Sequence, residues 1–145
     1  MVTGRVLVAG DGEVVRGPLL RLQAPLSFWG GVDPVRGTVS DPRHPDYGRS
    51  LAGQVVAVPS AVGSSSSSAI MLELIREGTA PRALLLGRAD AIVALGVVVA
   101  RELGLPALPV LEVPWAEVAE LAEGVELVVD GGDVRVSGSG GASRD

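Results

Sequence analysis

The chain of 145 residues has no cysteine, no lysine and a single histidine, His44. Without thiols it forms no disulfide and offers neither a cysteine nucleophile nor thiolate ligands for an iron–sulfur cluster. Without lysine it cannot form a Schiff base with a carbonyl substrate. One histidine excludes a histidine-rich metal site, and a Ser-His-Asp triad would have to use His44.

Basic patches and long apolar runs are also missing. The net charge is −5 and no run of like charges exceeds two residues, so nucleic acid is not an expected partner. The longest uncharged apolar run, residues 91–100, is too short to span a bilayer. Residues 1–5 do not resemble the start of a signal peptide. We therefore expect a cytoplasmic protein with no membrane partner.

The composition that remains suits one α/β domain. Hydrophobic residues make up 47% of the chain and aromatics only 3%, which predicts a core of Val, Leu, Ala and Ile. We expect this domain over residues 1–136, followed by a disordered Gly/Ser-rich tail over residues 137–145.

Alternating strand and helix patterns support this fold class. Apolar runs predict strands over residues 5–9, 54–59, 82–87 and 107–113, a hairpin over 125–136, and one bulged or two short strands within 13–22. Periodicity predicts helices over residues 68–77, 89–103 and 114–123. The second helix is apolar on nearly every side, so we expect it to be largely buried, with a strand at its valine run as the alternative. The strands at 54–59 and 82–87 flank a helix and should be parallel.

The best candidate for a binding or catalytic site is the segment Gly63-Ser-Ser-Ser-Ser-Ser68, which lies between a predicted buried strand and a predicted helix. One serine, Ser66 or Ser67, is expected to be the helix N-cap. Backbone amides and hydroxyls at a helix N-terminus form a site for a carboxylate or phosphate. The segment lacks the lysine of a P-loop, and the chain has no Gly-x-Ser-x-Gly elbow, so neither nucleotide hydrolysis nor a standalone serine hydrolase is supported.

Two further segments hold candidate residues. Phe28 and Trp29 lie in a turn-rich segment with Gly30, and are either core residues under a loop or a binding surface. His44 lies in a polar loop over residues 37–53, where it either holds the loop by local hydrogen bonds or contacts substrate or a partner. Asp33 is a turn residue or part of the same surface.

Three motifs together resemble the small swivel subunit of the aconitase X family. They are Phe28-Trp-Gly-Gly-Val-Asp-Pro34, the stretch from His44 to Pro59, and the serine segment followed by Leu72 to Ala83. The resemblance covers residues 2–113. It implies the swivelling β/β/α domain of aconitase-like hydro-lyases. It also implies a larger, cysteine-containing partner chain that holds an iron–sulfur cluster, while this chain binds no cofactor.

The resemblance implies roles for the serines as well. Ser64, the first after Gly63, would be the base that removes the substrate α-proton, and Gly63, Ser65, Ser66, Ser67 and Ser68 would bind a carboxylate or phosphate substrate. The candidate contacts to substrate or partner are Phe28, Trp29, Gly30, Asp33 and His44. The expected reaction is dehydration of cis-3-hydroxy-L-proline, or alternatively of mevalonate 5-phosphate. An alternative of another class is a non-catalytic anion-binding module.

Overall fold

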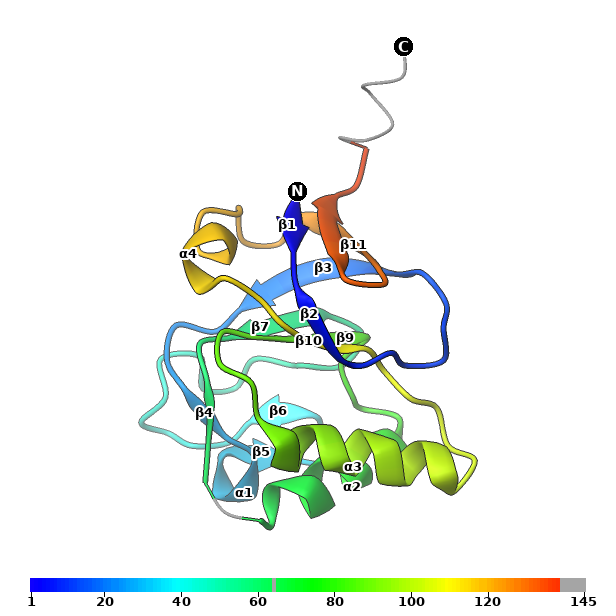
Figure 1. The fold of residues 1–145 in the computed structure, drawn as a ribbon. Coiled ribbons are helices and arrows are strands. Elements are labelled where there is room, and N and C mark those ends of the chain that lie inside the picture. The colour runs from blue at the N-terminus through cyan, green and yellow to red at the C-terminus, as the bar shows by residue number, and fades with distance from the viewer. Residues whose placement is uncertain (64, 139–145) are drawn as a thin grey trace.

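In the computed structural model, which describes residues 1–63 and 65–138, a mixed eight-stranded sheet forms the frame of the protein (Figure 1). Its strands are β1 (Val2–Thr3), β2 (Arg5–Val8), β3 (Val15–Arg21), β7 (Val55–Val58), β9 (Ala83–Leu86), β10 (Val110–Glu112), β11 (Glu126–Asp130) and β12 (Asp133–Val136). Their spatial order is β1-β12-β11-β3-β7-β9-β10-β2. Only Gly4 separates β1 from β2 along the chain, so the sheet nearly closes on itself.

The remaining elements are shorter strands and four helices. The strands are β4 (Leu26–Ser27), β5 (Val32–Asp33), β6 (Thr38–Val39) and β8 (Ala61–Val62). The described helices are α1 (Phe28–Gly31), α2 (Ser67–Glu77), α3 (Ala91–Glu102) and α4 (Trp115–Val118). Figure 1 shows α2 and α3 together on one side of the sheet and α4 on the opposite side.

The sheet separates two hydrophobic clusters. Alternate residues of a strand point to opposite faces, so Val56 and Val58 of β7 pack with α2 and α3 while Val55 and Ala57 face the second cluster. The second cluster lies between the strands and Val118 of α4. All four residues of β7 are fully buried, as the uncharged run predicts for a central strand.

The predicted parallel unit is confirmed. Strands β7 and β9 pair in parallel from Val55↔Ala83 to Val58↔Leu86, with α2 as the crossover helix between them. Strands β3 and β10 extend this parallel core on either side. The carboxyl ends of β7 and β9 therefore share one edge of the sheet, and the segments that leave this edge are the serine loop and the connection to α3.

Segment 13–22 contains one strand, β3, with no break at Gly17-Pro18. Its first part, residues 15–18, pairs antiparallel with β11, and residues 19–21 pair in parallel with β7. Proline cannot donate to a ladder and is tolerated where pairing is interrupted. Pro18 stands where the strand changes neighbours, which explains why the strand continues through it.

Residues 91–102 are a helix, α3, so the alternative of a strand is wrong. The expectation that this helix is largely buried is wrong for one face, where Ile92, Leu95 and Val99 are 37%, 52% and 37% exposed. The other face carries the buried residues Val93, Val97 and Ala100. Periodicity identified the helix, but it could not show that only one side is covered, because both sides are apolar.

The third predicted helix is much shorter than residues 114–123. Helix α4 ends at Val118. The guanidinium of Arg21, on β3, donates hydrogen bonds to the carbonyl oxygens of Val118 and Leu121. In a helix over residues 114–123 the Val118 carbonyl would accept from the amide of residue 122, so a contact distant in sequence competes with the continuation of α4.

At the carboxyl end, the Ser137 amide donates to Glu126 O at 2.8 Å. Residues 139–145 lie outside the described residues, so the disordered tail stays a prediction. Among the described helices, none combines the length and the apolar character that crossing a membrane requires.

Candidate functional site

The serine loop leaves the carboxyl end of the central strand β7 and leads into α2. It is held from one side by β4, because β4 and β8 pair in parallel with Ser27 opposite Val62, and the Leu26 amide donates to Ser60 O at 3.1 Å. This pairing brings segment 26–31 against the loop. Ser64 lies outside the described residues, whereas Gly63 and Ser65–Ser68 are described.

Gly63 is required at its position for two reasons. Its φ is +124°, a backbone conformation that residues with a Cβ rarely adopt. A Cβ at this position would also lie 3.2 Å from Ser27 Oγ and 3.5 Å from Ser67 Oγ. Two hydroxyls from distant parts of the chain therefore flank Gly63, immediately before Ser64.

The four described serines differ in their surroundings. Ser66 is at the N-cap position of α2, as predicted, although no capping hydrogen bond comes from its side chain. Ser67 is 2% exposed and lies beside Gly63. Ser68 Oγ donates to Ser65 O at 2.9 Å, which fixes the first turn. Ser65 is exposed, so of these four it is the residue most open to a ligand.

Segment 27–43 forms the wall of a cavity of about 390 Å³ beside the serine loop. The lining residues are Ser27, Trp29, Gly30, Gly31, Ser40, Asp41, Pro42 and Arg43. Two predicted residues, Trp29 and Gly30, are among them, and Trp29 is 58% exposed. Ser27 belongs both to this wall and to the contact with Gly63, so the cavity and the loop are adjacent.

Sequence reasoning missed four polar residues of this cavity, namely Ser27, Ser40, Asp41 and Arg43. They converge because β5 pairs antiparallel with β6 and the Ser40 amide donates to Gly31 O at 2.9 Å. The pairing joins two-residue strands, which leave almost no periodic signal. The Asp41-Pro-Arg43 turn was the one local signal, because aspartate before proline favours a turn.

Within this cavity, Asp41 and Arg43 form a local pair. The Arg43 amide donates to Asp41 Oδ1 at 2.9 Å, and Arg43 Nε donates to the same oxygen at 3.2 Å. The hydrogen bond from the Arg43 amide, and to a smaller extent the one from its side chain, holds the pKa of the Asp41 carboxyl below its ordinary value. Asp41 is therefore an ionised acceptor that orients the arginine.

His44 is turned into the protein. Its side chain is 6% exposed, its Nε2 lies 3.2 Å from Ala24 O, and its Nδ1 accepts a hydrogen bond from the Asp46 amide at 3.0 Å. Since Nδ1 accepts, it carries no proton, and Nε2 donates to Ala24. Both ring nitrogens are hydrogen-bonded to backbone groups, one within the loop and one at Ala24, which favours the interpretation that His44 holds the loop rather than contacts a substrate.

Within this loop, we expect the largest loss of stability on substitution of Asp46. Asp46 is 2% exposed and accepts from the Gln23 amide at 2.8 Å. Asp46→Ala removes the buried carboxylate and leaves the part-buried Gln23 amide without its acceptor, so we expect the free energy of unfolding to fall by about 1–3 kcal/mol. Urea denaturation measures this change. Asp130→Ala, at an exposed hairpin position, is the control, and equal midpoints for the two variants would contradict the prediction.

Two further residues predicted for the site, Phe28 and Asp33, have structural roles. Phe28 is fully buried in the cluster beneath α2 and α3, which favours the core interpretation for this residue. Asp33 Oδ1 accepts from the amides of Val35 and Arg36 at 3.0 and 3.2 Å, as expected of a turn residue. The segment 28–33 thus anchors itself through Phe28 and presents Trp29 and Gly30.

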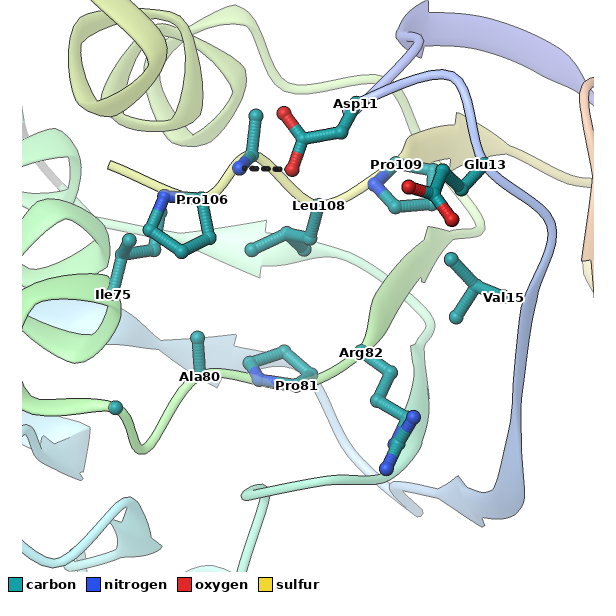
Figure 2. Close-up of a pocket in the computed structure, with 12 residues that line it drawn as sticks. Asp11, Glu13, Val15, Ile75, Ala80, Pro81, Arg82, Pro106, Leu108 and Pro109 are labelled. Carbon is teal, nitrogen blue, oxygen red and sulfur yellow. Dashed lines mark hydrogen bonds between the residues drawn. The ribbon is translucent and has the colours of Figure 1, made fainter. Parts of the chain in front are cut away.

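A second cavity, of about 310 Å³, lies at the amino ends of β9 and β10, away from the edge that carries the serine loop (Figure 2). Its walls are mainly apolar, with Pro81, Pro106 and Leu108 among them. Asp11 is fixed by accepting from the Ala107 amide at 3.1 Å, and Arg82 lies on the opposite wall (Figure 2). No residue predicted for the site lies here.

The described part of the chain does not supply the ligands of a metal cluster. The sequence has no cysteine, and residues 1–63 and 65–138 contain no group of three His, Cys, Asp or Glu side chains able to hold a metal ion. An iron–sulfur cluster does not fit these residues, and its ligands would have to come from outside this sequence.

The nearly closed sheet, the two helices over one face and the serine loop at the carboxyl edge define a swivelling β/β/α domain. The family described as the aconitase X swivel domain matches residues 1–137, and the chain belongs to this family. The fold agrees with a crystal structure of Thermococcus kodakaraensis aconitase X in its holo-form. The TM-score is 0.80 at 32% identity, with 93% of this chain and 96% of that chain covered.

Relatives of two kinds are similar to the chain. A protein of Pseudomonas aeruginosa named cis-3-hydroxy-L-proline dehydratase is 42% identical over 130 residues, which cover 83% of this chain and 22% of that protein. A phosphomevalonate dehydratase small subunit of Methanothermobacter thermautotrophicus is 37% identical over 134 residues, which cover 90% and 95%. The chain thus spans about a fifth of the first relative and nearly all of the second.

Proposed function

We propose that the chain is the small subunit of an iron–sulfur-dependent hydro-lyase and supplies the serine base for dehydration of a small β-hydroxy acid. The observation that carries the proposal is the serine loop of an aconitase X swivel domain, placed by Gly63 at the N-terminus of α2 beside a polar cavity. The substrates named in the relatives, cis-3-hydroxy-L-proline and mevalonate 5-phosphate, share a carboxylate, a proton on the adjacent carbon and a hydroxyl on the next.

In this proposal Ser64 removes the proton from the carbon next to the carboxylate. A serine hydroxyl is a weak base unless its deprotonated form is stabilised, and the N-terminal end of α2 provides a partial positive charge for that purpose. Ser65 contacts the substrate, because it is exposed next to Ser64. Ser67 and Ser68 hold the loop, since one is buried beside Gly63 and the other bonds to Ser65 O.

The proposed partner is a larger cysteine-containing chain. The relative from Pseudomonas aeruginosa is a single chain of which this domain covers about a fifth, and the archaeal relative is named a small subunit. The cluster expected on that partner would supply Lewis-acid chemistry toward the departing hydroxyl. This chain would add the base and the walls of the site.

Of the two substrates, we propose cis-3-hydroxy-L-proline first. The identity of 42% to the Pseudomonas protein supports it. Mevalonate 5-phosphate is the alternative, and one observation favours it: the chain matches the archaeal small subunit over 95% of that subunit's length. The two reactions use the same proton and hydroxyl positions, so the serine loop serves either.

Co-expression with the larger aconitase X chain of the same organism tests the proposal. We expect a brown complex that dehydrates one of the two substrates, whereas either chain alone is inactive. Turnover is followed by the loss of substrate under anaerobic conditions. A colourless chain that stays monomeric and binds anions by itself would instead support the non-catalytic binding module, and a complex inactive on both substrates would refute the proposed reaction.

A further inference from the structure

Arg43 is the cation in the wall of the cavity beside the serine loop. Its side chain is 91% exposed, and its Nε is occupied by Asp41. Within the described part of the chain, its two Nη groups donate no hydrogen bond. The guanidinium is thus oriented from one side and open on the other, an arrangement suited to binding a planar oxyanion through two parallel bonds.

Arg43 lies in the wall of a cavity that adjoins the serine loop. Ser27 lines the same cavity and lies against Gly63, the residue before Ser64. In a β-hydroxy acid, the carbon that loses its proton carries the carboxylate. A site that removes this proton must therefore hold the carboxylate close to the base, because the carboxylate is one bond from the carbon that loses the proton. The cavity that adjoins the loop is where that group would fall.

We infer that Arg43 binds the substrate carboxylate and thereby fixes the α-carbon at the serine loop, an inference that rests on the proposed function. Asp41 is a positioning residue in this arrangement, because it holds Nε and leaves the Nη pair for the ligand. Trp29 and Gly30 complete the wall around a small substrate. The recognised group is the carboxylate common to both candidate substrates and not the phosphate of one of them.

The test is Arg43→Gln in the assembled complex, with the substrate that the wild type turns over. Loss of a charge-assisted bond should raise KM by about 10- to 100-fold. We expect a smaller change in kcat, because the contact exists in the ground state. Arg43→Lys keeps the positive charge but loses the pair of parallel donors, so its KM should lie between those of the wild type and Arg43→Gln. Arg82→Gln is the matched control, since Arg82 is an exposed arginine of the other cavity (Figure 2).

The methyl ester of the substrate identifies the group that is bound. Used as a competitive inhibitor, the ester should bind wild type at least about 10-fold more weakly than the acid binds as substrate, and Arg43→Gln should not distinguish the two. Unchanged KM in Arg43→Gln, or equal discrimination by the variant, would overturn the inference. Loss of co-purification by Arg43→Gln would also overturn it, because Arg43 would then be an interface residue.

A readout without turnover separates the inference from the proposed function. Titration of the full chain with acetate, followed by amide chemical shifts, should give saturable shifts in residues 40–43 that disappear in Arg43→Gln and persist in Arg82→Gln. If the wild-type complex is inactive on both substrates, the proposed reaction fails while this titration still decides the inference. No saturable shift in the wild type would refute carboxylate binding at Arg43.

Discussion

Ser64→Ala is expected to lower kcat of the assembled complex by about 10²- to 10⁴-fold, the range that general base catalysis contributes. The alanine cannot accept the substrate proton, while the binding walls around Ser27 and Arg43 are unchanged. KM should therefore move little. Steady-state dehydration with the wild-type substrate measures the loss. Exchange of the α-proton with deuterated water should disappear in parallel, because the same group removes that proton.

Two controls define what this result means. Ser65→Ala, at the exposed neighbouring position, should lower kcat less than Ser64→Ala does, because it removes the proposed substrate contact and not the proposed base. Co-purification with the larger chain should be unaffected in both variants. Near-wild-type turnover by Ser64→Ala, with the complex intact, would show that the base is another group.

The sequence predicted the elements around this loop because their signals are local. Helix α2 has its apolar residues Met71, Leu74 and Ile75 on one side, and β7 is an uncharged run in the middle of the sheet. A serine run between such a strand and such a helix has to lie at the carboxyl edge of a parallel sheet. The location of the loop therefore followed from periodicity and from the order strand, loop, helix and parallel strand along the chain.

The walls of the site were not predictable in the same way. Ser27 and Arg43 are separated by 16 positions, and they meet through two-residue strands and single backbone hydrogen bonds. Their convergence depends on where Phe28 is buried, which is a tertiary contact. His44 is an example of the opposite kind, a residue that its type and its polar loop made a candidate for the site. Its two ring nitrogens are instead hydrogen-bonded to backbone groups of Ala24 and Asp46.

The packing of α3 against α2 connects stability to the loop. Gly96 lies in close contact with α2, since a Cβ at this position would stand 2.5 Å from Ser68 O and 3.0 Å from Met71 Cβ. Ser68 is the second residue of α2 and bonds to Ser65 O. Any side chain at position 96 must therefore displace the start of α2, and with it the segment that carries the serines.

Gly96→Val is expected to lower the free energy of unfolding by about 3 kcal/mol, at the upper end of overpacking costs. The nearest atom is a backbone oxygen, so a rotamer change cannot relieve the contact. Gly96→Ala should cost less, because alanine stabilises a helix by up to about 1 kcal/mol relative to glycine. Chemical denaturation measures both variants. We also expect reduced turnover for folded Gly96→Ala in the complex, because the N-terminus of α2 is displaced.

Leu95→Val is the control for this change. It introduces the same β-branched side chain into the same helix, one residue away, at a position that is 52% exposed. Its effect should stay within about 0.5 kcal/mol, as for surface substitutions. If Gly96→Val and Leu95→Val unfold at the same denaturant concentration, the helices are not in close contact at residue 96. If Gly96→Ala is destabilised but fully active, the helix contact supports the fold without setting the position of the serine loop.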